Sequence, residues 1–77
     1  MSERYITRRR RGRGFDYLSP NGKLITSKRE IERINKLGIP PAYRQVRIST
    51  NPNAKVQAKA IDSEGRQQWK YHPDHVK

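Results

Sequence analysis

The chain has 77 residues, of which 18 are lysine or arginine and 7 are aspartate or glutamate, so its formal net charge is +11. This length allows one small, marginally stable domain, and a hydrophobic content of 31% indicates that part of the chain stays unfolded when alone. The absence of cysteine excludes disulfides and thiolate metal sites, and no apolar run approaches the roughly 18 residues of a membrane span. We expect a soluble, intracellular protein whose charge attracts nucleic acid first and acidic membrane surfaces second.

The most basic segment is residues 1–14. Its arginines outweigh Glu3 to give a net charge of +5, and Tyr5 and Ile6 are its only core-forming side chains. Because like charges repel and little apolar surface offsets the entropy of ordering, we predict a flexible arm ahead of one folded domain over residues 15–77. Polyarginine is typical of localisation or solubility segments, and it can also grip phosphates. In the second case the contacts come from Arg8, Arg9, Arg10, Arg11 and Arg13.

A β-hairpin is predicted at the start of the folded part. Strand-forming residues 15–18 precede the turn sequence Ser19-Pro20-Asn21-Gly22, and residues 23–25 return. Proline presets φ at the first central position of such a turn, and glycine takes the left-handed site after it.

A helix from near Lys28 to Leu37 follows the hairpin. Ser27 and Glu30 have the spacing of a capping box, and apolar residues recur at helical intervals from Ile31 onward. Gly38 supplies a left-handed C-terminal residue, and the two prolines that follow prevent continuation of the helix. An extra short helical turn over residues 41–44 is an open alternative.

Three more strands complete the prediction. Residues 45–49 alternate, with Val46 and Ile48 on one side and Arg47 on the other. Residues 55–61 alternate more cleanly, and a turn at 62–65 with glycine in fourth place leads to a closing strand over 66–71. In the 55–61 strand we predict Val56, Ala58 and Ala60 inward and Lys55, Gln57 and Lys59 outward. The sum is an α+β fold with about five antiparallel strands and one main helix packed on one face, which leaves the other face to water or a ligand.

No group of side chains indicates catalysis. His72 and His75 lie beyond the last strand, where an exposed polar tail is a better interpretation than a metal site that lacks a third ligand. No serine or threonine has an identifiable base and orienting group, and the sequence around Gly12 and Gly14 lacks the lysine and the helix of a phosphate loop. We expect no cofactor, no metal and no catalytic residue in this chain.

The closing strand has the residues of a nucleic-acid contact. Basic and amide side chains alternate with aromatic rings along it. Glutamine can pair with adenine and arginine with guanine, and a two-stranded ribbon fits the major groove of B-DNA. The predicted contacts are Arg66, Gln68, Trp69, Lys70 and Tyr71, with Lys55, Gln57 and Lys59 from the neighbouring strand. In the plainer alternative, Trp69 and Tyr71 pack under the helix and the charged residues form a solvated face.

Three segments together carry a family likeness. They are Gly14–Tyr17 with the Asn21-Gly22-Lys23 hairpin, the stretch INKLGIPPAY over Ile34–Tyr43, and the stretch DSEGRQQWKYH over Asp62–His72. In order and spacing they resemble the amino-terminal domain of type IB DNA topoisomerases, above all the small enzymes of bacteria and of large DNA viruses, including poxviruses.

The resemblance implies a two-domain clamp around duplex DNA, with the closing strand of this small domain in the major groove. A Gln-Tyr-x-Tyr stretch of the poxvirus-like members corresponds to Gln68, Trp69 and Tyr71, and tryptophan keeps the ring while losing the hydroxyl. The nucleophilic tyrosine and its helpers belong to a carboxy-terminal catalytic domain of the same polypeptide, so none of the tyrosines here is the nucleophile. The implied partners are duplex DNA and that catalytic domain, in a monomeric enzyme.

Such an enzyme relaxes supercoils by transient cleavage and religation of one strand, without ATP, and it is found with the DNA in a bacterial cytoplasm or a viral factory. Composition alone also fits a small RNA-binding or ribosome-associated protein. A third interpretation makes the arm a ligand for acidic lipid.

Overall fold

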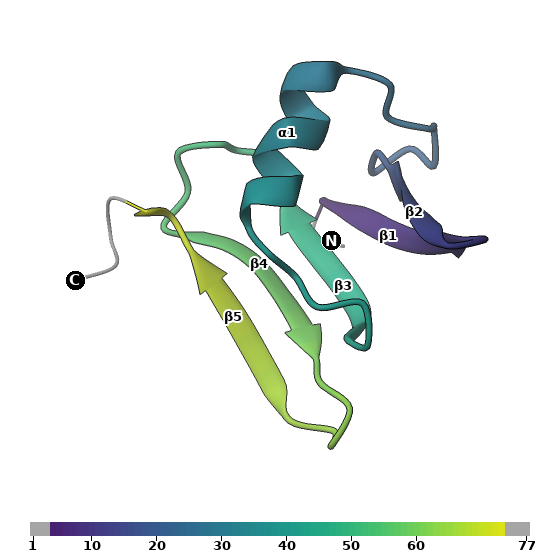
Figure 1. Cartoon of the computed structure of the whole chain (residues 1–77). Coiled ribbons are helices and arrows are strands. Elements are labelled where there is room, and N and C mark those ends of the chain that lie inside the picture. Colours follow the sequence, from purple (N-terminus) through teal and green to yellow (C-terminus); the bar gives the residue numbers. More distant parts are fainter. Residues whose placement is uncertain (1–3, 74–77) are drawn as a thin grey trace.

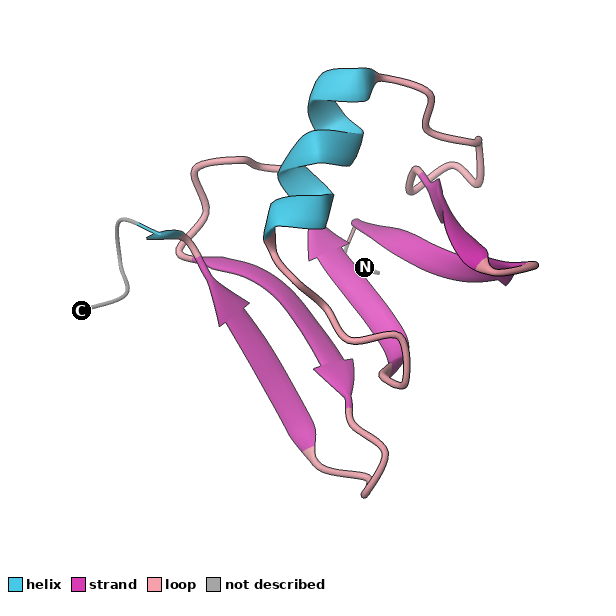
Figure 2. Ribbon diagram, in the orientation of Figure 1, coloured by secondary structure: helices cyan, strands magenta, loops and turns pink. Residues whose placement is uncertain are grey.

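The chain folds into one five-stranded antiparallel sheet with a helix against one face (Figure 1). The computed structural model describes residues 4–73. The elements are β1 (Tyr5–Arg11), β2 (Gly14–Leu18), α1 (Lys28–Lys36), β3 (Arg44–Ser49), β4 (Val56–Ile61) and β5 (Gln67–Tyr71). The strand order is β2-β1-β3-β4-β5, so the predicted α+β class with a five-stranded antiparallel sheet is confirmed. Figure 2 shows the β1–β2 ribbon turned relative to β3–β5, as the twist of sheets requires.

The helix begins and ends where local chemistry predicts. The Ser27 hydroxyl accepts a hydrogen bond from the Glu30 backbone N–H at 3.4 Å, which satisfies one free donor of the first turn. Gly38 adopts φ +64°, the left-handed conformation expected after the last turn. The residues after Pro40 form a turn closed by the Tyr43 N–H on the Pro40 carbonyl at 3.1 Å, and α1 is the only α-helix between residues 4 and 73.

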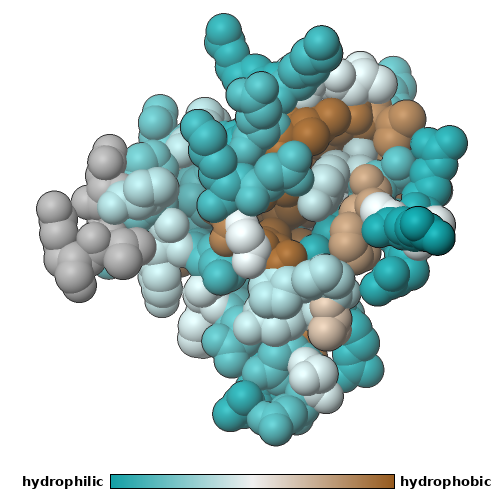
Figure 3. Space-filling view, viewed as in Figure 1, coloured by the Kyte–Doolittle hydropathy of each residue, from teal (hydrophilic) through white to brown (hydrophobic). Residues whose placement is uncertain are grey.

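The core lies between α1 and the three central strands. Ile34 of the helix is 1% exposed and packs against buried side chains of β1, β3 and β4, namely Ile6, Val46, Ile48, Ala58 and Ala60. Burying one isoleucine side chain stabilises a fold by about 1.5–3 kcal/mol, so Ile6, Ile34 and Ile48 each contribute on this scale. Figure 3 shows the apolar side chains gathered beneath and beside the helix, with hydrophilic side chains around them.

The prediction of a flexible arm over residues 1–14 is wrong for residues 5–11, which form β1 near the middle of the sheet. Residues 1–3 lie outside the described part. β1 pairs with β2 on one side and β3 on the other, so its backbone groups are bonded in two ladders. Ile6, which is 2% exposed, anchors the strand in the core. Hydrogen-bond acceptors, a carboxylate and a ring around the arginines offset their mutual repulsion.

The first hairpin is also built differently from the prediction. Gly22 adopts φ +85° in the expected turn, closed by its N–H on the Ser19 carbonyl at 2.8 Å. The returning residues 23–25, however, form only an isolated bridge between Leu18 and Leu24. β2 instead pairs along its length with β1. The predicted number of strands is therefore right, but β1 takes the place of the strand expected at 23–25.

A bulge in β4 overturns the predicted alternation at its start. Val56 pairs with Tyr71 and Ala58 with Lys70, so Gln57 is one extra residue on this strand. Gln57 and Ala58 are both buried on the helix side, whereas Val56 is 39% exposed on the opposite face. The predictions of an outward Gln57 and an inward Val56 are wrong, and those for Ala58 and Ala60 are confirmed.

Candidate nucleic-acid interface

The face of the sheet opposite α1 is not covered by any described element, and basic and aromatic side chains project from it. We call it the open face. Strand register places Thr7, Arg47, Lys59 and Trp69 in one row across β1, β3, β4 and β5. Directly paired residues of antiparallel strands point to the same side. The core side of the same strands carries Ile6, Ile48 and Ala58, so the row lies on the face away from the helix.

On one side of this row lies an aromatic hollow of about 410 Å³. Tyr5 of β1 and Trp69 of β5 line it together with Val56, and Arg47 and Lys59 border it. The Lys59 ammonium lies 5.0 Å from the centre of the Tyr5 ring, in cation–π range. Trp69 is 49% exposed and Tyr71 43% exposed, so the alternative in which both rings pack under the helix is wrong.

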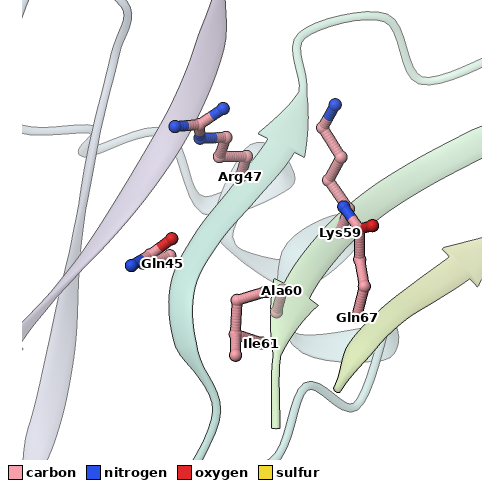
Figure 4. A pocket seen from close by; sticks show the side chains of 6 residues that line it. All are labelled: Gln45, Arg47, Lys59, Ala60, Ile61 and Gln67. Atoms are coloured by element: carbon pink, nitrogen blue, oxygen red, sulfur yellow. The ribbon is translucent and has the colours of Figure 1, made fainter. Parts of the chain in front are cut away.

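On the other side of the row lies a smaller, amide-lined hollow of about 100 Å³ (Figure 4). Gln45 of β3 and Gln67 of β5 lie on either side of it, and Ile61 and Ala60 contribute its apolar part. Arg47 and Lys59 border this hollow too, so the two cations stand between an amide-lined and an aromatic surface. Such a surface can attract phosphate and present hydrogen-bonding groups and rings to bases at the same time.

The arginines of β1 divide between the two faces because alternate residues of a strand point to opposite sides. On the helix side, Arg8 donates three hydrogen bonds to the carbonyls of Ile39, Pro40 and Tyr43 at 3.2, 3.0 and 2.9 Å. Its guanidinium also lies 4.1 Å from the Phe15 ring centre, and that of Arg10 lies 5.1 Å from it. Arg8 therefore supports the fold and is not part of the open face.

Arg9 and Arg11 point to the open side of β1, where both approach Asp16. The nitrogen–oxygen distances are 3.3 Å for Arg9 and 3.6 Å for Arg11. Their side chains remain 62% and 74% exposed, and Arg13 is exposed in the turn between β1 and β2. Of the five arginines predicted as phosphate contacts, these three extend the open face towards the β1–β2 hairpin.

Asp62 organises the turn that leads into β5. Its carboxylate is 5% exposed and accepts backbone hydrogen bonds from Glu64 and Arg66, both at 2.9 Å. It also accepts from the Arg66 guanidinium at 3.1 Å and the Gln68 amide at 3.0 Å. The hydrogen bond from the Arg66 backbone N–H has the largest influence on the pKa of Asp62, and it lowers this pKa. Burial raises it, but the Gln68 side chain, the Glu64 backbone and the Arg66 side chain lower it further, so the pKa falls from 3.8 to about 2.

Two of the predicted contacts are consequently held by this carboxylate. Gln68 pairs with Ala60 on the helix side of β5, and its amide is engaged with Asp62. Arg66 remains exposed but also pairs with Glu64 at 2.7 Å. Lys70 pairs with Ala58 on the helix side and is half-buried, while Lys55 is exposed just before β4.

Gln57 is a structural residue. It is 2% exposed, its carbonyl oxygen accepts from Arg33 of the helix at 2.7 Å, and its amide donates to the carbonyls of Asn51 and Ala54. Arg33 also donates to the Ser49 carbonyl at 2.8 Å and to Glu30 at 2.7 Å. The predicted contact set therefore divides: Lys59, Trp69 and Tyr71 lie on the open face, and Gln57 belongs to the support beneath it.

Sequence reasoning did not select Arg47, Tyr5, Gln45 and Gln67 as site residues. The alternation of residues 45–49 already put Arg47 opposite the core side chains Val46 and Ile48, and this was the usable signal. Composition predicts a flexible arm where β1 lies, so it contains no signal for Tyr5. Among residues 4–73 there is no cluster of three or more metal-ligating side chains, and no helix there is long and apolar enough to cross a membrane.

Comparison with known proteins gives this fold a family. Residues 14–62, which run from β2 to the end of β4, match the family described as the N-terminal domain of bacterial DNA topoisomerase IB. The chain is also 45% identical over 60 residues to a DNA topoisomerase 1B of Acanthamoeba polyphaga mimivirus. That similarity covers 78% of this chain but only 18% of the viral relative's length. Since the family match extends over more than half of the residues, the chain belongs to the bacterial DNA topoisomerase IB N-terminal domain family.

Proposed function

We propose that this chain is the non-catalytic, duplex-DNA-binding domain of a type IB topoisomerase, and that it binds DNA through its open face. The parent enzyme would cleave one strand by tyrosine attack on phosphate, allow rotation and religate without ATP. The nucleophile would come from a carboxy-terminal catalytic domain, and this domain would hold the duplex opposite it and position the scissile phosphate.

The observation that carries the proposal is the row from Thr7 to Trp69 on the uncovered side of the sheet. Four neighbouring strands span about 14 Å at the usual interstrand spacing. The major groove of B-DNA is about 12 Å wide, so one row of side chains can face the groove and the phosphates that flank it. Arg47 and Lys59 provide the cations of this row, and Trp69 and Tyr71 provide ring surface beside it.

The basic hairpin extends this surface. Arg9, Arg11 and Arg13 are exposed beyond the row, and we infer that they neutralise additional phosphates. Gln57, which is buried, would act through the fold, and Arg8 would do the same because three carbonyls hold its guanidinium.

The test is a salt titration of binding to duplex DNA with the full 77-residue chain, read by fluorescence anisotropy. The logarithm of the binding constant should fall with the logarithm of salt concentration by about 0.9 for each phosphate neutralised. Replacing Arg47 and Lys59 by alanine together should make this slope shallower by about 1.8. The matched control is Arg29→Ala with Lys36→Ala, which removes the same charge from exposed positions on the helix.

Equal changes in the two double variants would mean that only net charge matters, and the open face would lose its assignment. The same titration with duplex RNA and single strands addresses the other reading of the composition. Tighter binding to either of these than to duplex DNA would overturn the duplex-DNA proposal in favour of an RNA-binding protein.

A further inference from the structure

The four glutamines of β3, β4 and β5 divide into two pairs according to the hydrogen bonds of their side chains. The Gln57 amide is fully engaged with Arg33 and two backbone carbonyls, and the Gln68 amide nitrogen donates to Asp62. Gln45 and Gln67 have no side-chain hydrogen bond within residues 4–73, and both are exposed. The two unengaged amides line the same small hollow, although they come from strands that do not pair with each other (Figure 4).

Gln45 occupies its position at an energetic cost. Arg44 pairs with Ile61 and Arg47 with Lys59, so β3 carries one extra residue in a bulge. Gln45 sits in this bulge with φ +51°, and it is the only non-glycine residue between 4 and 73 with a positive φ. Glycine is the residue that suits such a position. A side chain at this strained position, whose amide has no hydrogen-bond partner among residues 4–73, indicates a use for that amide.

The hollow has the chemistry of one base-pair type. A glutamine amide can donate its N–H to adenine N7 and accept from the adenine N6 amino group, which makes a matched pair of hydrogen bonds. An apolar side chain can contact the thymine methyl group. Ile61 lies between the two amides and offers that apolar contact. The strands of Gln45 and Gln67 are two interstrand spacings apart, about 10 Å, so both amides fit within a major groove about 12 Å wide.

We propose that the hollow formed by Gln45, Ile61 and Gln67 recognises adenine–thymine pairs from the major groove. This inference rests on the proposed duplex-DNA binding and adds a base preference to it. It assigns base reading to Gln67 on the open face, and it leaves Gln68 as a support for the turn, because the Gln68 amide is held by Asp62. Arg47 and Lys59, which border the hollow, hold the flanking phosphates.

The experiment compares two short duplexes of equal length with identical flanks and a central block of either A·T or G·C pairs. Binding of the full 77-residue chain is measured by anisotropy at one salt concentration. We expect the A·T duplex to bind about tenfold more tightly, in line with one or two good amide–adenine contacts. Replacing adenine by 7-deazaadenine, or thymine by uracil, removes a major-groove group and should each reduce this preference.

The protein variants are Gln45→Gly and Gln67→Ala, each of which should lose most of the preference while retaining its salt-dependent binding. Gln45→Gly suits the backbone of the bulge, so it keeps the fold and isolates the amide. The control is Asn35→Ala, which removes an exposed amide from the helix and should leave the preference unchanged.

Equal binding of the two blocks, or tighter binding of the G·C block, would overturn the base preference and leave the proposed function standing. A preference that survives both base analogues and both glutamine variants would also overturn it, because the shape of A·T-rich DNA would then be the cause. If no duplex binds, the proposed function itself fails, and the base preference fails with it.

Discussion

Arginine side chains on the two faces of the sheet have opposite surroundings. On the helix side, Arg33 is 17% exposed and donates to Glu30, to Gln57 and to the Ser49 carbonyl. On the open face, Arg47 has no hydrogen-bond acceptor among the described residues and stands exposed between two hollows. The two residues have the same chemistry, yet one is a structural cross-link from helix to sheet and the other is available to a ligand.

This difference teaches how to interpret a strongly basic small domain. Net charge indicates the class of partner, but it does not say which cations face that partner. In β1 the division occurs between consecutive residues, because Arg8 is bound by three carbonyls and Arg9 is 62% exposed. Strand alternation and the position of α1 decide which arginine is held within the fold and which is exposed on the open face.

The largest expected effect concerns the helix-side arginine. Arg33→Ala removes the charged donor from the buried Gln57 oxygen and from the Ser49 carbonyl, and a buried acceptor without its partner costs about 1–3 kcal/mol. We expect the free energy of unfolding, measured with urea, to fall by about 2–3 kcal/mol. Arg29→Ala on the exposed side of the same helix should change it by about 0.5 kcal/mol or less. Similar values for the two variants would erase the distinction between the faces.

The next effect is pH-dependent and concerns Asp62, which accepts hydrogen bonds from Arg66, just before β5, and from Gln68, the second residue of β5. Its pKa is lower in the folded chain, at about 2, than the ordinary 3.8 that applies to the unfolded chain. The unfolded state therefore binds the proton more readily, so the stabilisation by Asp62 is complete above pH 3.8 and is lost as the pH falls towards 2.

Urea unfolding at a series of pH values checks this expectation. The wild-type chain should lose stability over that interval, and Asp62→Asn should be less stable at neutral pH with a shallower decline in acid. Glu64→Gln is a suitable control, since its side chain is 67% exposed. An Asp62→Asn variant that follows the wild-type pH curve would show that this carboxylate does not hold the turn.

A smaller effect, of opposite sign, is expected at the bulge of β3. Gln45→Gly replaces the only described non-glycine residue at positive φ by the residue that this backbone suits. Relief of the left-handed conformation should raise the free energy of unfolding by about 1 kcal/mol. Gln67→Gly, in a regular strand at the sheet edge, should lower it by a similar amount. Loss of stability in Gln45→Gly would mean that the Gln45 side chain supports the fold.

Elements set by local chemistry were predictable, and those set by distant pairing were not. Ser27 and Gly38 mark the two ends of the helix through contacts or conformations of nearby backbone, and Gly22 and Gly65 adopt the positive φ that their turns require. A short window of sequence is therefore enough to predict these elements. β1 is a strand because β2 pairs with its second half and β3 with its first, and a count of its arginines cannot reveal these partners. In the regular part of β4 the period-two pattern is sufficient, because Lys59 faces away from the core as alternation predicts.

The bulges explain the remaining errors in the candidate site. One extra residue in β4 moves Gln57 to the buried side and Val56 to the open face, whereas strict alternation predicted the reverse. Likewise the alternation of β5 predicts Gln68 as a contact residue, whereas its amide donates to the carboxylate of Asp62, six positions earlier. The first depends on the register between two strands and the second on a side-chain contact to the turn before β5, and period-two patterns encode neither.

The smallest expected effect on stability is that of Arg9→Gln, and it tests the open side of β1. The Arg9–Asp16 pair has an exposed guanidinium at 3.3 Å, and surface pairs of this kind contribute about 0–1 kcal/mol, so the free energy of unfolding should hardly change. If Arg9 holds a phosphate, the plot of the logarithm of the DNA-binding constant against the logarithm of salt concentration should nevertheless become shallower by about 0.9. Glu32→Gln, an exposed helix variant that alters charge in the opposite direction, should leave the slope unchanged. A stability loss in Arg9→Gln as large as that in Arg33→Ala would contradict the division of the β1 arginines, because it would make the open side of the strand structural as well.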